Sequence, residues 1–426
     1  MYWIVIIALI FFLRAGTPLA YIVGAATALT FIITGNVRYL AVLPQRIFSQ
    51  IDIFSLMAMP LFILVGEVMN HTGVTRYLVN FSMSVMGRFK GGLGHVNVMT
   101  SIFFAGVSGS AVADAAALSN ILVPAMRERG YTNTYAAALT AAASIIGPII
   151  PPSIIMVFYG VLMQVSVGGL LISGLIPGFM LGGALMAINT FFAHRYNHPG
   201  GRGEKMPSFL PSFVKALPAL ALPVIILGGI AFGIVTPTEA AALAVIAALG
   251  AGMFYRGVSF SNLVASFKRT ASLTGSIFVV MVAAACFGWI AALEHWPQQL
   301  ATFATGLGLS GASFFLMINA VFLLCGMFLD IPLTLALIVP LFGPVATAQG
   351  IHPIHLGVVI CLNLTIGMMT PPYGACLITV SAITKEDYWS LSRALLPFIF
   401  VEVAILMLIT FIPELSLFLP RIFGFS

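Results

Sequence analysis

Two long apolar stretches are each interrupted by paired prolines in the middle of what would otherwise be a membrane-spanning helix. They are Ser144-Ile-Ile-Gly-Pro-Ile-Ile-Pro-Pro-Ser153 and Asn363-Leu-Thr-Ile-Gly-Met-Met-Thr-Pro-Pro-Tyr-Gly-Ala-Cys376. Proline supplies no backbone N–H group, so a helix cannot pass through either stretch intact and carbonyl groups are released. At membrane depth, such carbonyls are tolerated only where they are buried in protein or line a wet cavity. Two unrelated Pro kinks are the alternative, but a matched pair of breaks favours a binding site.

The composition indicates an all-α polytopic membrane protein. Of 426 residues, 60% are hydrophobic and only 7% are charged, whereas about 25% are charged in typical soluble domains. The apolar runs are continuous, without the period-two alternation of a membrane barrel. The four cysteines lie in apolar runs without CxxC spacing, so no disulfide or metal site is predicted. The net charge of +6 requires no nucleic-acid partner, because lysines and arginines in loops set membrane orientation.

Uninterrupted apolar runs predict the membrane-spanning helices. The run at 1–13 lacks a basic start and a cleavage site, so we interpret it as a retained span. The runs at 131–163 and 353–383 contain the proline breaks. The other predicted spans lie at 16–35, 55–72, 168–194, 213–234, 236–255, 275–293 and 392–412.

Two further apolar regions are interrupted by polar residues at their centres. Residues 92–126 contain Gly106-Val-Ser-Gly-Ser110, and residues 310–346 contain Gly326-Met-Phe-Leu-Asp330. Each region can enter the membrane and return, but each half is too short to cross it comfortably. They are therefore predicted to be re-entrant helical hairpins. The amphipathic stretches 75–90 and 259–272 are predicted to be helices lying in the interface plane, with ordinary loop helices as the alternative.

The chain repeats itself at an offset of 220 residues. From Gly91 to Pro152, seven Gly or Pro residues meet their own kind at that offset, against about one expected by chance. The pairs include Gly147 with Gly367 and Pro151 with Pro371. The repeat predicts the following units: scaffold helices at 1–54, a first repeat at 55–195, a linker with scaffold helices and an interfacial arm at 196–274, a second repeat at 275–412, and a tail at 413–426.

The distribution of basic residues predicts the orientation. If the N-terminus is outside, 15 of the 18 lysines and arginines fall inside, and only Arg38, Arg46 and Arg421 fall outside. Both termini are then periplasmic. Residues 55–72 run inward and residues 275–292 run outward, so the repeats are inverted. Inverted repeats with broken helices are typical of secondary transporters.

The hairpin tips and the breaks supply oxygen atoms for two predicted sodium sites. A carboxylate at membrane depth is costly, so a cation would compensate it. The proposed ligands include no histidine or cysteine, which argues against transition metals. Proton coupling is the alternative, and an N-cap role is the alternative for Asp330, since Ile331-Pro332 starts a helix well. The predicted ligands are Ser108 and Ser110 with Gly147, Pro148, Ile150 and Pro151, and Asp330 with Gly367, Met369 and Thr370.

Polar residues near the same depth are candidates for binding an anionic solute, together with helix N-termini. Hydrogen bonding between helices is the alternative for each of them, and a cap or packing role is the alternative for Asp114. Glu67 and Glu402 also lie in or beside apolar runs, and Glu239 fits a capping box. His352 and His355 are interpreted as ordinary loop-to-helix residues. The predicted substrate-binding residues are Ser108, Asp114, Ser153, Asn363, Thr365 and Tyr373.

Five motifs stand out in combination. They are Pro60-Leu-Phe-Ile-Leu-Val-Gly-Glu67, Gly106-Val-Ser-Gly-Ser-Ala-Val-Ala-Asp114, Gly147-Pro-Ile-Ile-Pro-Pro-Ser153, Thr236-Pro-Thr-Glu-Ala240 and Thr370-Pro-Pro-Tyr-Gly374. On these motifs, nearly the whole chain resembles the large membrane subunit of tripartite ATP-independent periplasmic (TRAP) transporters, the DctM-like family, and the sialic acid branch most.

The resemblance implies an elevator-type transporter in the bacterial inner membrane, driven by a sodium gradient. It implies two partners, a separate four-span membrane subunit (DctQ-like) and a periplasmic substrate-binding protein (DctP-like), besides membrane lipid. It implies an organic acid as substrate, such as sialic acid or a C4-dicarboxylate. The alternatives are a proton-coupled organic-anion transporter and an ion channel. An intramembrane enzyme is disfavoured, because no nucleophile–base pair or metal motif lies on these helices.

Overall fold

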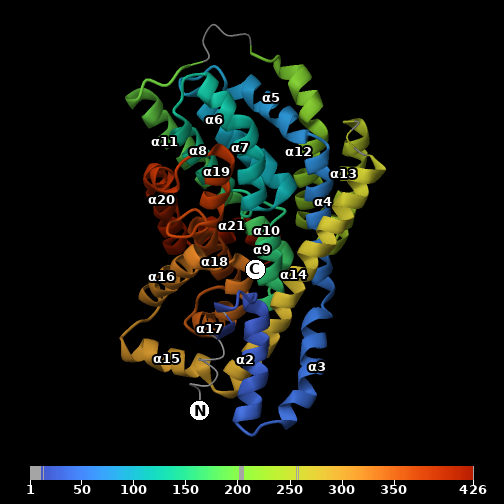
Figure 1. The fold of residues 1–426 in the computed structure, drawn as a ribbon, viewed down its shortest axis with the longest axis vertical. Helices are drawn as coiled ribbons and strands as arrows, with labels where there is room; N and C mark the ends of the chain where they lie inside the picture. The colour runs from blue at the N-terminus through green and yellow to red at the C-terminus, as the bar shows by residue number, and fades with distance from the viewer. Residues whose placement is uncertain (1–10, 13, 201–205, 256, 258, 426) are drawn as a thin grey trace.

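The computed structural model describes residues 11–12, 14–200, 206–255, 257 and 259–425, which form helices joined by short turns (Figure 1). Most of the span predicted at 1–13 lies outside the described residues. So do three basic residues that were predicted to be cytoplasmic: Arg202, Lys205 and Arg256.

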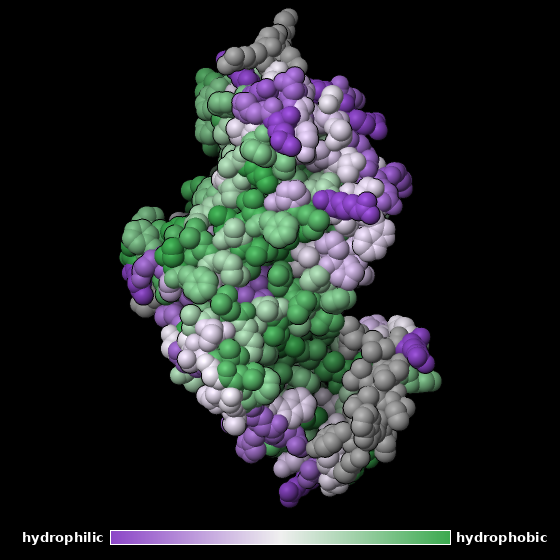
Figure 2. Space-filling model, turned by 90° about the vertical axis from the view of Figure 1, so that its left-hand side faces the viewer, coloured by the Kyte–Doolittle hydropathy of each residue, from purple (hydrophilic) through white to green (hydrophobic). Residues whose placement is uncertain are grey.

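Seven helices in the described part of the chain are long and apolar enough to cross a membrane. On the face shown in Figure 2, hydrophobic side chains cover the middle of the molecule and hydrophilic ones gather toward its ends. This distribution fits a protein whose middle lies in lipid. The predicted all-α polytopic class is therefore confirmed.

An N-terminal pair of helices precedes the first half, and two long helices follow it. In the described part of the chain, the first half runs from the short 3-10 helix η1 through eight further elements, α4 to α11. The bounds are α2 (Leu19–Ile33), α3 (Arg38–Ile51), η1 (Phe54–Met57), α4 (Ala58–His71), α5 (Val74–Met86), α6 (Gly92–Ser108), α7 (Ala111–Glu128), α8 (Asn133–Ser144), α9 (Ile154–Met163), α10 (Val167–Ser173), α11 (Leu175–Arg195), α12 (Phe209–Ala231) and α13 (Pro237–Phe254).

The second half shows the same order of elements: a long helix, a shorter one, a hairpin and a broken helix. In Figure 1 the hairpin α6–α7 lies in the upper part of the molecule and α16–α17 in the lower part. The bounds are α14 (Phe260–Leu293), α15 (Trp296–Gly306), α16 (Ala312–Phe328), α17 (Ile331–Ala348), α18 (Pro353–Gly367), α19 (Ala375–Thr384), α20 (Tyr388–Phe411) and α21 (Glu414–Ile422).

One predicted boundary is wrong. The interfacial stretch 259–272 and the span 275–293 are not separate elements, because α14 continues through both for 34 residues. Only Gly275 lies between them as a helix-weakening residue, and one glycine costs about 1 kcal/mol in a helix interior. The sequence also did not predict α3 or α15 as separate helices. α3 contains Pro44 within its length.

Both predicted breaks are present. α8 ends at Ser144 and α9 begins at Ile154, while α18 ends at Gly367 and α19 begins at Ala375. In both breaks the peptide bond between the two prolines is cis. The segments between the helices are turns and bends. Some of their carbonyl groups, such as that of Ile146, still accept backbone hydrogen bonds, but the regular helical ladder is interrupted.

Each hairpin is tied to a broken helix by a buried amide. Asn97 of α6 donates to the Thr140 hydroxyl of α8 at 2.6 Å, and Asn363 of α18 donates to Asn319 Oδ1 of α16 at 2.5 Å. The second pair of helices also approaches closely, since a Cβ atom on Gly367 would lie 2.5 Å from the carbonyl carbon of Gly326. These contacts hold each hairpin tip beside a break.

Candidate functional site

A cavity of about 400 Å³ lies where both hairpin tips face the helices α4 and α14. We call it the central cavity. Its lining joins residues that are more than 200 positions apart in the sequence, because both tips contribute to one wall. The tip-and-break wall includes Ser108, Ser110, Pro148, Asp330, Pro332 and Met368, and the α4–α14 wall includes Glu67, Asn70, Arg269 and Leu273.

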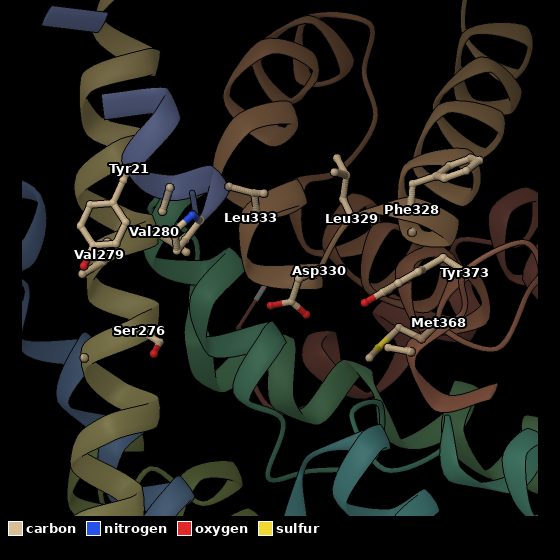
Figure 3. Close-up of a pocket in the computed structure, with 15 residues that line it drawn as sticks. Tyr21, Ser276, Val279, Val280, Phe328, Leu329, Asp330, Leu333, Met368 and Tyr373 are labelled. Carbon is tan, nitrogen blue, oxygen red and sulfur yellow. The ribbon is translucent and has the colours of Figure 1, made fainter. Parts of the chain in front are cut away.

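A second pocket, of about 620 Å³, adjoins the central cavity and shares Asp330, Ser276 and Met368 with it. Its remaining lining is mostly apolar, with Tyr21 and Leu333 among the contributors. Figure 3 shows the Asp330 carboxylate pointing into the space between α14 and the second break. Asp330 therefore stands between two cavities, and it is exposed to both of them.

The tip of the first hairpin contains a half-satisfied carboxylate. Asp114 is fully buried in the first turn of α7, and its Oδ1 atom accepts a hydrogen bond from Ser108. No hydrogen-bond donor reaches Asp114 Oδ2 among the described residues. The N-cap of α7 is Ser110, whose hydroxyl accepts a hydrogen bond from Ala113 N at 3.5 Å. The cap interpretation of Asp114 is therefore wrong, because Ser110 occupies that position.

The first break packs directly against this carboxylate. A Cβ atom on Gly147 would lie 2.1 Å from Asp114 Oδ2, so only glycine fits there without movement. The carbonyl group of Pro148 already accepts a hydrogen bond from the Ser153 hydroxyl. Those of Gly147, Ile150 and Pro151 accept none from the described residues. Three of the four predicted carbonyl ligands in this break are thus uncommitted.

The second predicted sodium site is built differently. Asp330 occupies the N-cap position of α17, but its side chain accepts no capping hydrogen bond. The Thr370 hydroxyl donates to Ile366 O at 2.7 Å, and Thr370 N donates to Gly367 O at 2.9 Å. The carbonyl group of Met369 accepts no hydrogen bond from the described residues. A carboxylate without a capping hydrogen bond and an uncommitted carbonyl therefore occur on this side as well.

Four of the six predicted substrate-binding residues do not line the central cavity: the fully buried Asp114, Ser153, Asn363 and Thr365. Ser153 is the N-cap of α9 and accepts a hydrogen bond from Met156 N at 3.2 Å. Asn363 is buried against Asn319, and Thr365 donates to Leu362 O within its own helix at 2.9 Å. Helix-to-helix and intrahelical bonding thus fits these side chains better. Tyr373 is 55% exposed and lines the second pocket, where its hydroxyl points toward the same space as Asp330 (Figure 3).

An ion pair on the opposite wall was not assigned a role from the sequence. Arg269 Nε lies 3.0 Å from Glu67 Oε1, and both residues line the central cavity with Asn70. Glu67 and Asn70 are three positions apart on α4, which is the one sequence signal that they share a face. Nothing in the sequence indicates that Arg269 reaches them from another helix.

The other polar residues singled out from the sequence do not line the central cavity. The capping box at Thr236 and Glu239 is present, as predicted. His355 contacts the Ser416 hydroxyl at 2.7 Å, and the described residues contain no group of His, Cys, Asp and Glu side chains suited to a metal ion. Both carboxylate oxygens of Glu402 are buried without a hydrogen-bond partner among the described residues.

Three helices begin at the central cavity. The starts of α7 at Ala111, α9 at Ile154 and α17 at Ile331 all line it. The N-terminus of a helix carries unsatisfied N–H groups and a partial positive charge, so it attracts anions. The cavity therefore combines carboxylates and free carbonyl groups, which suit a small hard cation, with helix starts that suit an anion.

Residues 6–415 match the family model described as tripartite ATP-independent periplasmic transporter, DctM component. The chain belongs to this family. The DctM-family chain is 37% identical over 416 residues to the sialic acid TRAP transporter large permease protein SiaM of Vibrio cholerae, with 96% of each chain covered. It is 36% identical over 404 residues to the C4-dicarboxylate TRAP transporter large permease protein DctM of Pseudomonas aeruginosa, with 95% and 94% covered. The predicted family is thus confirmed, and the chain is a membrane component of a multi-part transporter.

The fold of this DctM-family chain is similar to that of the YdaH transporter of Alcanivorax borkumensis, whose crystal structure was described as having an unusual topology. The TM-score is 0.67 at 14% sequence identity, and 88% of this chain and 87% of the other are covered. At that identity the likeness concerns the fold alone.

Proposed function

We propose that the chain is the large subunit of a sodium-driven importer of an organic acid. The observation that carries the proposal is the buried Asp114 Oδ2 atom, which has no partner among the described residues. An ionised carboxylate in such a place costs several kcal/mol unless a positive charge balances it. No lysine or arginine lies near enough to form an ion pair with Asp114 among the described residues. A bound cation would balance it.

Sodium fits the surrounding donor set. The candidate ligands around the first tip are Ser108, Asp114 and the free carbonyl groups of the adjacent break, all of which are oxygen donors. Oxygen donors favour hard cations over transition metals. When bound, sodium would supply the charge that balances Asp114 and would tie the tip to the break. We propose a second sodium site at the tip of the second hairpin, with Asp330, Met369 and Thr370 as its ligands.

The helix starts at the central cavity support an anionic solute. A carboxylate there would face the partial positive charge at the N-termini of α7, α9 and α17. The relatives are named for sialic acid and for C4-dicarboxylates. We therefore propose one of these acid classes as the substrate, with sialic acid first because the SiaM relative is the more similar of the two. Ser108, which lines the cavity, is the proposed polar contact.

The remaining components follow from the family name, which describes a tripartite system. We propose a four-span membrane subunit and a periplasmic substrate-binding protein as the other two parts, in the bacterial inner membrane. The two halves are proposed to be inverted repeats that carry the solute by an elevator movement. This chain by itself should then take up free solute poorly.

Uptake into proteoliposomes that contain all three parts tests the proposal. Radiolabelled sialic acid and succinate should accumulate with an inward sodium gradient, and accumulation should stop when choline replaces sodium. A proton gradient that drives uptake without sodium would instead support the proton-coupled alternative. Unitary currents in a planar bilayer would support the channel.

A further inference from the structure

Arg269 is the one cationic side chain among the described residues that line the central cavity. It comes from α14, whereas Ser108 and the helix starts come from the hairpins and the first break. The same lining contains two carboxylates, Glu67 and Asp330. The helix starts attract a solute carboxylate in this space, and the two side-chain carboxylates repel it. The position of the single guanidinium therefore determines whether the α4–α14 side of the cavity attracts or repels the solute.

The guanidinium is held from one side. Arg269 Nε lies 3.0 Å from Glu67 Oε1, while the Arg269 side chain is 70% exposed and that of Glu67 only 14%. No hydrogen-bond or ion-pair partner of the terminal Nη atoms occurs among the described residues. These atoms form the edge of the guanidinium that binds a carboxylate through two parallel hydrogen bonds.

A second donor lies close by on α4. Asn70 follows Glu67 by three residues, so both project from the same face of the helix. Asn70 lines the cavity and is exposed, and its amide has no hydrogen-bond partner among the described residues. Two uncommitted donor groups from two helices therefore border the same space.

We propose that Arg269 and Asn70 form an anion subsite on the α4–α14 wall, which binds a carboxylate group of the transported acid. Glu67 positions the guanidinium and competes with the solute for it. This competition keeps binding weak enough for the solute to leave, whereas an unopposed arginine would retain it. The inference rests on the proposed function, because it concerns the acid that the central cavity receives.

The alternative is that the ion pair only ties α4 to α14. The two interpretations predict different signs for two substitutions. If the pair is a tie, Arg269→Gln and Glu67→Gln should alter solute binding in the same direction, or not at all. If it is a subsite with a competing carboxylate, Arg269→Gln should weaken binding and Glu67→Gln should strengthen it. The Arg269 side chain is 70% exposed, so its loss should cost little stability, and Glu67→Gln keeps the size of the more buried side chain. Both variants should therefore fold.

The measurement is equilibrium binding of radiolabelled sialic acid and succinate to the purified membrane complex in nanodiscs at saturating sodium. We expect the Kd of the bound acid to rise about tenfold in Arg269→Gln, which corresponds to about 1.4 kcal/mol. It should rise about threefold in Asn70→Ala and fall about threefold in Glu67→Gln, both within the range of single hydrogen bonds. Lys268→Gln is the matched control, because Lys268 is exposed on α14 and does not line the cavity. Its Kd should stay within about twofold of that of the wild type.

Thermal unfolding of each variant, measured in parallel, identifies loss of fold. Wild-type affinity in Arg269→Gln, or weaker binding in Glu67→Gln comparable to that in Arg269→Gln, would overturn the subsite. If the wild type still transports the acid, either of these two results would overturn the subsite but leave the proposed function intact. A wild-type complex that neither binds nor transports the two acids would overturn the proposed substrate class and the subsite with it.

Discussion

Ser108 donates a hydrogen bond to Asp114 Oδ1 across the tip of the first hairpin, and Asp114 Oδ2 remains buried without a partner in the described part of the chain. The two residues are six positions apart and lie on different helices, α6 and α7, which meet at Gly109. Gly109 has φ +61°, a conformation that side chains rarely adopt, so the tip can turn tightly enough to bring them together. The tip thus presents one half of a carboxylate to the adjacent break.

Asp114→Asn should raise the sodium concentration for half-maximal uptake by about tenfold or more. The substitution keeps the shape of the side chain but removes the charge that would balance a cation in a low-dielectric site. Initial uptake rates against sodium concentration test this, with surface-expressed protein quantified in parallel. Asn120→Ala, an exposed change on the same helix, is the control. An unchanged sodium dependence in Asp114→Asn would remove this carboxylate from the proposed site.

Asp330→Asn separates a sodium ligand from an N-cap. Asparagine caps a helix about as well as aspartate, and the Asp330 carboxylate makes no capping hydrogen bond here. The variant should therefore fold normally but require several-fold more sodium for uptake. Ser108→Ala should have a milder effect, because a neutral oxygen contributes less than a carboxylate. Normal sodium dependence at normal expression in both variants would leave the carbonyl groups of the breaks as the remaining candidates.

Gly147→Ala should destabilise the protein by about 1–3 kcal/mol, the usual cost of overpacking. The new Cβ atom would lie 2.1 Å from Asp114 Oδ2, so the break or the carboxylate must move. Gly183→Ala is the matched control, because a Cβ atom there would meet nothing within 4 Å. Thermal unfolding in detergent compares the two variants. Equal stability would show that the first break is not packed against Asp114.

Asn363→Ala should affect stability more than substrate affinity. Its amide bonds Asn319 at 2.5 Å in a buried contact between α16 and α18. The loss of one partner from such a contact costs about 1–3 kcal/mol. Binding of sialic acid or succinate by the folded variant should stay near the wild-type value. A selective loss of binding with normal unfolding temperature would restore Asn363 to the substrate site.

Cysteine accessibility tests the predicted orientation. Ser208 and Ser310 are exposed and lie in turns that are predicted to be cytoplasmic and periplasmic, respectively. A membrane-impermeant maleimide added to spheroplasts should label Ser310→Cys and spare Ser208→Cys, in a background without the four native cysteines. Permeabilised cells should label both variants. The reverse pattern would invert the proposed topology.

The sequence predicted the elements of this protein that depend on local chemistry. Two adjacent prolines in the interior of a helix remove two backbone N–H donors and clash with the preceding turn, so the interruptions near Pro151 and Pro371 could be predicted directly. The capping box at Thr236 is equally local. The membrane class follows from apolar content alone. The boundary inside α14 was predicted wrongly, because Gly275 weakens a helix only slightly and packing along its length overrides that preference.

Tertiary structure alone decided which polar residues share a space. Ser108 and Asp330 line one cavity although 222 residues separate them, whereas Asn363, with an equally suggestive position in the sequence, packs against Asn319. The ion pair between Glu67 and Arg269 could not be predicted from the sequence either. Helical periodicity indicates which residues share a face of one helix, but not which other helix that face contacts. The sequence by itself therefore determined where the helices break and how polar the tips are. The rotation and contact of whole helices, set by packing over the entire bundle, determined which of those oxygens and donors form a site.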